Sequence, residues 1–159
     1  MLDYNAIVQR NIGVLTWEQQ EKLRRATVAV AGVGGVGGIA AERLARLGIG
    51  HIRIADPETF EPTNLNRQLG SGQSTLDRNK AEIIGRLLLD INPGLDLTCL
   101  NEGVSADNVD AFVVGSDIVV DGVDYDALSV SLELHRASRR TGVYVITAFA
   151  IGFGATMQV

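Results

Sequence analysis

The stretch Thr27-Val-Ala-Val-Ala-Gly32-Val-Gly34-Gly35-Val-Gly37-Gly38 decides the fold class of this 159-residue chain. Its first half is a continuous apolar run of strand length, which is typical of a parallel strand buried on both faces. Its second half has glycines at the spacing of a turn that leads from such a strand into a helix. The first glycine permits the tight turn, the second lets the backbone approach a phosphate, and the third lets the helix pack on the strand.

Strand and helix patterns alternate along the rest of the chain. Strands are expected at 27–32, 51–55, 95–100, 117–121 and 143–148, and helices at 17–25, 39–47, 80–91, 105–114 and 127–140. The segment 151–159 is punctuated by glycine and stops in mid-pattern. This alternation predicts an α/β fold with a doubly wound, mostly parallel, Rossmann-like sheet and right-handed crossovers.

Several local signals refine these elements. Thr16 and Gln19 form the pattern of a capping box, and Ser105 and Asp126 are candidate caps of two later helices. In the helix at 39–47, the apolar spacing predicts one face made of Ile39, Ala40, Leu44 and Leu47, with Glu42, Arg43 and Arg46 facing elsewhere. We divide the chain into an N-terminal helical segment, 1–26, and a nucleotide-binding domain, 27–159.

Composition excludes some classes of function. The net charge of −5 is unfavourable for nucleic-acid binding, which needs a basic face. No stretch is long and apolar enough for a membrane helix, and the N-terminus has no signal core. The single cysteine, Cys99, permits neither an intrachain disulfide nor a multi-cysteine zinc site, and we expect it to be buried and inert on its strand. We therefore expect a cytoplasmic protein.

A nucleotide site is predicted at the glycine turn. Its candidate residues are Gly32, Gly34, Gly35 and Gly37, because a helix N-terminus after such a turn attracts phosphate. Asp56 ends the next strand, where a carboxylate can accept hydrogen bonds from ribose hydroxyls. The alternative is a purely structural glycine-rich turn that serves only helix packing. By itself the motif favours NAD.

The segment 57–79 favours ATP instead. It is too long for an ordinary connection, and such loops are usually functional or disordered. It contains Asn64, Asn66, Arg67 and Gln68, and Lys80 follows it. Arg and Lys match the charge of a triphosphate, whereas a hydride-transfer enzyme has no evident need for them here. The alternative is a solvated polar loop.

Three aspartates lie around the fourth strand. Asp121 and Asp124 are at its carboxyl end, where ligands bind in open α/β sheets, and Asp117 is at the other end. Asp124 is a candidate Mg²⁺ ligand, because Mg²⁺ bridges carboxylates and phosphates. For Asp121 a structural role is at least as plausible.

Together these residues resemble the ThiF/MoeB/HesA family, relatives of the ubiquitin-activating enzymes. The resemblance runs from Arg10 to Gly154. Its motifs are GVGGVGG at 32–38, GIGHIRIAD at 48–56, TNLNRQ at 63–68, Lys80, INP at 91–93 and DIVVDGVD at 117–124.

The resemblance implies an adenylyltransferase that uses ATP and Mg²⁺. It adenylylates a carboxylate, usually the C-terminal Gly-Gly of a small ubiquitin-like or sulfur-carrier protein, and releases pyrophosphate. Asp56 would bind ribose, and Asn64, Arg67, Lys80 and Gln68 would lie at the triphosphate. Asp124 would hold Mg²⁺. The resemblance also implies a homodimer in which Arg10 acts in trans at the other subunit's site.

The chain departs from the family pattern in places. It has Val123-Asp124-Tyr125 where Thr-Asp-Asn is common, and Asp77-Arg78-Asn79-Lys80 where Gly-x-Pro-Lys is common. The family's downstream catalytic and zinc cysteines are absent, which indicates a fragment of a longer protein that lacks its C-terminal extension. Alternative functions are dehydration of threonylcarbamoyladenosine on tRNA, a non-catalytic nucleotide-binding subunit, and an NAD-dependent oxidoreductase.

Overall fold

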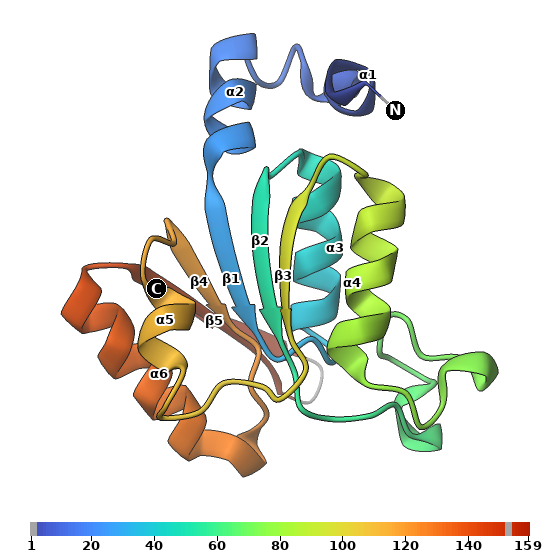
Figure 1. The fold of residues 1–159 in the computed structure, drawn as a ribbon, viewed down its shortest axis with the longest axis vertical. Coiled ribbons are helices and arrows are strands. Elements are labelled where there is room, and N and C mark those ends of the chain that lie inside the picture. The colour runs from blue at the N-terminus through green and yellow to red at the C-terminus, as the bar shows by residue number, and fades with distance from the viewer. Residues whose placement is uncertain (1–2, 152–153) are drawn as a thin grey trace.

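The computed structural model describes residues 3–151 and 154–159, and these form an α/β fold (Figure 1). Six strands make one sheet in the order β3-β2-β1-β4-β5-β6. The strands are β1 Thr27–Ala31, β2 His51–Ala55, β3 Asp96–Leu100, β4 Ile118–Asp121, β5 Tyr144–Ile151 and β6 Gly154–Gln158. The first five run parallel, and β6 pairs antiparallel with β5. The predicted doubly wound, mostly parallel sheet is confirmed.

Helices cover both faces of the sheet (Figure 1). The helices α3, Gly37–Leu47, and α4, Lys80–Ile91, pack on one face, and α5, Val109–Val113, and α6, Leu128–Thr141, pack on the other. Each layer has its own apolar core, one centred on Val30, Ile54 and Ile84 and one on Val119, Phe112 and Leu134. The connections through α3 and α6 leave β1 and β4 in opposite directions, so a crevice opens between these strands at their carboxyl ends.

The N-terminal residues form α1, Tyr4–Val8, which the sequence did not indicate, and α2, Trp17–Arg25. The predicted capping box of α2 is present: Thr16 Oγ1 accepts from the Gln19 backbone N–H, and the Gln19 side chain accepts from the Thr16 backbone N–H. Short 3₁₀ turns occur at Gln9–Asn11, Pro62–Asn64, Gln73–Thr75 and Tyr125–Ala127. Among the described residues, no helix is both long and apolar enough to cross a lipid bilayer.

Two predicted helix caps are wrong. Helix α5 begins at Val109 rather than after Ser105, because the Asn108 side chain accepts from the Ser105 backbone N–H and closes a turn before the helix. Asp126 caps nothing: it lies inside a 3₁₀ turn that Asp124 caps, and no side chain caps α6. In both places a polar side chain stabilises a turn instead of a helix.

The predicted face of α3 is partly wrong. As predicted, Leu44 packs against the core, and Arg43 and Arg46 are exposed. Ile39 is 44% exposed and Leu47 37% exposed, whereas Ala41, Ala45 and Glu42 are buried. Small residues form the buried face because α3 lies very close to the sheet: a Cβ on Gly37 would stand 3.3 Å from the Val30 side chain. The buried Glu42 carboxylate is paired with Arg43 and Arg46.

The C-terminal part of the chain and Cys99 differ from expectation as well. Residues 154–158 of the glycine-punctuated segment form the antiparallel strand β6, and residues 152–153 lie outside the described residues, as do residues 1–2 of the N-terminal segment. Cys99 is exposed, because β3 is an edge strand. Partial burial of its thiol still raises the thiol's pKa, which disfavours the reactive thiolate.

Candidate functional site

A pocket of about 510 Å³ lies at the carboxyl ends of the parallel strands, at the crevice between β1 and β4. Its wall combines the glycine turn after β1 with residues that follow β2 and β4 and with part of β5. Of the predicted site residues, the following line it: Gly32, Gly34, Gly35, Asp56, Arg67, Gln68, Lys80 and Asp124. Residues far apart in sequence therefore meet where the fold class predicts a ligand.

The glycine turn has two kinds of glycine. Gly32 has φ +77°, and a Cβ there would lie 2.4 Å from the Gly122 oxygen, while a Cβ on Gly37 would lie 1.8 Å from the Gly32 oxygen. These two glycines are required by packing, and Gly37 does not line the pocket. Gly34 and Gly35 do line it, and a Cβ on Gly35 would meet nothing within 4 Å. Because no side chain caps the N-terminus of α3, its first N–H groups suit an anion.

Asp56 connects the end of β2 to the glycine turn. Its Oδ2 accepts from the Val33 backbone N–H at 2.8 Å, and its Oδ1 accepts from the Glu58 backbone N–H at 2.9 Å. Burial raises the pKa of this carboxyl above its ordinary value of 3.8, although the two hydrogen bonds and the nearby Lys80 charge act in the opposite direction. Asp56 thus has a structural role, and its carboxylate still borders the pocket.

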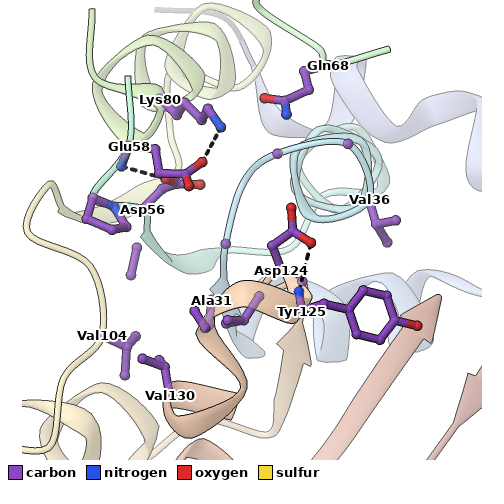
Figure 2. A pocket seen from close by; sticks show the side chains of 18 of the residues that line it. Ala31, Val36, Asp56, Glu58, Gln68, Lys80, Val104, Asp124, Tyr125 and Val130 are labelled. Atoms are coloured by element: carbon purple, nitrogen blue, oxygen red, sulfur yellow. Dashed lines mark hydrogen bonds and ion pairs between the residues drawn. The ribbon is translucent and has the colours of Figure 1, made fainter. Parts of the chain in front are cut away.

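Lys80 is 3% exposed, and its Nζ pairs with Glu58 Oε2 at 2.5 Å. Figure 2 shows this ion pair with Asp56 close by. The Glu58 side chain is 64% exposed and lines the pocket, but sequence reasoning missed it. Its position two residues after the strand-ending Asp56 was the available signal. The Glu58 carboxylate neutralises the buried Lys80 ammonium.

The segment 57–79 is ordered around the pocket. Arg67 donates to the Thr63 carbonyl at 2.9 Å and stays exposed at the pocket, and Gln68 lies over Gly34. The Gln68 Oε1 atom is buried and has no hydrogen-bond partner among the described residues, which leaves an acceptor for a ligand hydroxyl or amine.

Two predicted residues of this segment do not line the pocket. Asn64 is buried and accepts from the Glu61 backbone N–H, and it therefore shapes the loop. Asn66 is exposed and contacts Arg67. Both lie close in sequence to lining residues, so their assigned ligand roles stay predictions.

Asp124 lies across the pocket from Lys80 (Figure 2) and accepts from the Tyr125 backbone N–H at 2.7 Å. The described residues hold no group of three or more His, Cys, Asp or Glu side chains that could bind a metal ion. One exposed carboxylate suits Mg²⁺ nonetheless, because this ion commonly keeps several waters and takes its remaining ligands from substrate phosphates.

The other two aspartates are structural. Asp117 accepts from the Thr27 backbone N–H at the far end of the sheet, as its predicted position implied. Asp121 is buried and does not line the pocket.

An aromatic pair forms a further part of the pocket wall. Tyr125 stacks on Phe149 of β5 with ring centroids 5.2 Å apart, and both line the pocket. Sequence reasoning missed this pair because the two residues meet only through the β4–β5 pairing.

Arg10 does not line the pocket of its own chain. The next residue, Asn11, donates to the Leu47 carbonyl at the C-terminal end of α3, whereas the pocket lies at the N-terminal end of that helix. The helix has 11 residues and is therefore about 16 Å long. A role for Arg10 at a nucleotide site would thus require a second subunit.

Comparison with known proteins agrees with this fold. Residues 8–159 match the model of the ThiF family, and the chain belongs to that family. It is 31% identical over 140 residues to the sulfur carrier protein ThiS adenylyltransferase of Escherichia coli K12, with 88% of this chain and 55% of that protein covered. It is 39% identical over 116 residues to the tRNA threonylcarbamoyladenosine dehydratase of Bacillus subtilis 168, with 72% of this chain and 46% of that protein covered.

A solved structure has the same fold. The E. coli tRNA N6-threonylcarbamoyladenosine dehydratase TcdA in complex with ATP superposes with a TM-score of 0.85 at 29% identity, covering 93% of this chain and 62% of that one. The chain covers 55% of the ThiS adenylyltransferase and 46% of the B. subtilis dehydratase, so it spans about half the length of these two curated relatives.

Proposed function

We propose that this chain is the nucleotide-binding part of an adenylyltransferase that uses ATP to activate a carboxylate. The supporting observation is a single pocket that combines an uncapped helix N-terminus behind Gly34 and Gly35 with Lys80, Arg67 and Asp124. This combination suits a triphosphate better than a dinucleotide, because two cations and a candidate metal ligand match the charge of a triphosphate, which exceeds that of the pyrophosphate of NAD. The ATP complex of TcdA is consistent with this choice.

In the proposed reaction a carboxylate oxygen of the acyl substrate attacks the α-phosphorus of ATP. An acyl–phosphate bond forms, the bond to the bridging oxygen breaks, and pyrophosphate leaves. Lys80 and Arg67 stabilise the charge that grows on the phosphate oxygens, with Asn64, Asn66 and Gln68 holding the surrounding loop and nucleotide. Asp56 accepts from the ribose hydroxyls. Bound Mg²⁺, held by Asp124 and phosphate oxygens, would supply further charge neutralisation.

Lys80 is the residue that must change partner in this scheme. Its ammonium is paired with Glu58, and an incoming phosphate would compete for it. Because the Glu58 side chain is largely exposed, it can turn into solvent at little cost when a phosphate replaces it. Catalysis then rests mainly on positioning and electrostatics.

The acyl substrate that we propose is the C-terminal glycine of a small sulfur-carrier or ubiquitin-like protein ending in Gly-Gly. The ThiS adenylyltransferase relative supports this class. A second candidate is the activation of threonylcarbamoyladenosine on tRNA, which the 39% identity to the dehydratase favours. The net charge of −5 is less suited to an RNA substrate.

ATP–pyrophosphate exchange tests the proposal and separates the two substrates. Wild-type protein should exchange label only with the true carboxylate, supplied either as a Gly-Gly-ending carrier protein or as modified tRNA. Lys80→Ala and Arg67→Ala should each lower exchange by about a hundredfold or more, the scale of losing one transition-state charge contact. Lys22→Ala, which removes an exposed lysine paired with Glu18 on α2, is the matched control and should exchange normally. Full exchange in the Lys80 and Arg67 variants would refute the site.

A further inference from the structure

Behind the pocket, outside its lining, polar side chains surround Asp121 at the carboxyl end of β4. Asp121 is 2% exposed. Its Oδ1 accepts from the Val123 backbone N–H at 3.1 Å, and its Oδ2 accepts from the Ser131 hydroxyl at 2.6 Å. His135 Nε2 lies 3.1 Å from the same Oδ2. A buried carboxylate with these partners is held firmly in one place, because losing any of them would leave charge unsatisfied.

The cluster joins three elements. Ser131 and His135 lie one turn apart on α6, and His135 Nε2 also lies 3.2 Å from Thr147 Oγ1 on β5. Because a carboxylate oxygen accepts hydrogen bonds, this contact calls for the tautomer of His135 that carries a hydrogen on Nε2. The His135 side chain is 46% exposed on its other side. Helix α6 therefore holds the Asp121 carboxylate through two side chains, and Thr147 of β5 contacts one of them.

This carboxylate is hydrogen-bonded to the turn that carries Asp124. The Val123 N–H bonded to Asp121 lies in the middle of the turn 122–124. On the other side of the turn, the Gly122 N–H donates to the Ala31 carbonyl at 2.8 Å, and Gly122 packs directly against Gly32. The Asp124 side chain is exposed and accepts from the neighbouring Tyr125 N–H, and the Asp124 carbonyl accepts from the Ala127 N–H at 3.0 Å. The Asp121 carboxylate and the Ala31 carbonyl thus hold the turn from one side, and the 3₁₀ turn Tyr125–Ala127 holds it from the other.

We propose that Asp121, Ser131 and His135 are positioning residues that fix Asp124 for Mg²⁺ bound to the nucleotide. This inference rests on the proposed function. It predicts that loosening the cluster weakens the contribution of Mg²⁺ to ATP binding without changing the binding of ATP alone. Partners behind a metal ligand typically change metal affinity by about ten- to a hundredfold when removed.

Calorimetric titration with ATP, in the presence and absence of Mg²⁺, tests the inference without measuring activity. In the wild type Mg²⁺ should tighten ATP binding, and Asp124→Ala should abolish that gain. The double variant Ser131→Ala/His135→Ala and the isosteric Asp121→Asn should each reduce the gain by about tenfold. His135→Gln, whose amide can still donate to Asp121, should stay close to wild type. ATP binding without Mg²⁺ should be the same in the Asp121, Ser131 and His135 variants as in the wild type.

Arg136→Ala is the matched control on α6, because Arg136 pairs with Glu133 instead of Asp121. If the double variant fails to fold, His135→Ala alone replaces it, since this side chain is partly exposed. A wild type that does not bind ATP would defeat the proposed function itself. Two results overturn the positioning role if Mg²⁺ tightens ATP binding in the wild type. One is an Asp124→Ala variant in which Mg²⁺ tightens ATP binding as much as in the wild type. The other is a set of cluster variants that melt earlier and keep this full effect of Mg²⁺.

Discussion

Gly32 and Gly35 belong to the same turn, but an added methyl group should affect them differently. Gly32→Ala should lower the free energy of unfolding by at least about 2 kcal/mol, because the position has positive φ and faces the Gly122 oxygen. Gly35→Ala should fold normally, since its Cβ has open space, yet bind ATP more weakly because the methyl group projects into the pocket. Urea unfolding and calorimetry measure the two effects. A Gly35→Ala protein that binds ATP like the wild type would argue against phosphate at this turn.

Asp56 should make the free energy of unfolding fall as the pH rises through the pKa of its carboxyl group. Burial raises its pKa above 3.8 in the folded protein, so the fold retains the proton to higher pH than the unfolded chain. The stability from this group is therefore fully present below about pH 3.8 and is lost as the pH rises through the raised pKa. An asparagine side chain does not titrate, so Asp56→Asn should remove this pH-dependent loss of stability.

Urea unfolding of both proteins from about pH 3 to pH 7 measures the Asp56 contribution as the difference between the two curves. Wild type should lose stability relative to Asp56→Asn as the pH rises above 3.8. A relative gain over this range would show that hydrogen bonds, and not burial, dominate at this carboxylate.

Among secondary-structure elements, those with strong local signals were predicted well. The bounds of α2 and α4 match the predicted 17–25 and 80–91, because a capping box marks the start of α2 and apolar periodicity marks α4. The start of α5 and part of the buried face of α3 were wrong, because turn hydrogen bonds and close helix–sheet packing outweigh local preference there. The strand β6 lacked a periodic pattern, and its pairing with β5 is set by tertiary structure.

The junction between the loop and α4 allows a test of one element. Asn79 Oδ1 accepts from the Glu82 N–H and caps α4, while its Nδ2 donates to the Asp56, Glu58 and Asn101 carbonyls. Asn79→Ser keeps a capping oxygen and loses the bonds to these carbonyls, whereas Asn79→Ala loses both functions. Thermal unfolding should rank wild type above Asn79→Ser above Asn79→Ala, with about 1 kcal/mol between the last two. Equal stability of the two variants would show that the cap contributes nothing.

At the scale of the whole molecule, the sheet order explains which parts of the site were predictable. In open α/β sheets, ligands bind at the carboxyl ends of the strands. This rule brings together the parts of the site that come after parallel strands, which are the glycine turn, Asp56, Lys80 and Asp124. The Tyr125–Phe149 pair and the contact of His135 with Thr147 depend on β5 lying beside β4, and no local pattern encodes that neighbour. Glu58 was missed because a single acidic residue in a loop is usually solvated.

The proposed homodimer also belongs to this scale. If Arg10 acts across a subunit interface, Arg10→Ala and Lys80→Ala proteins should each lack ATP–pyrophosphate exchange. Mixing them should restore exchange at about a quarter of the sites, because one site is intact in each of half the dimers. No recovery after subunit exchange, verified by sedimentation or mass spectrometry, would contradict the trans role.

Direct titration of the purified chain with ATP·Mg²⁺ and with NAD, by calorimetry, tests the central claim that the pocket binds a triphosphate. The account predicts saturable binding of ATP, its loss in Lys80→Ala, and no competition from NAD. Binding of NAD without ATP, or ATP binding that does not depend on Lys80, would contradict it.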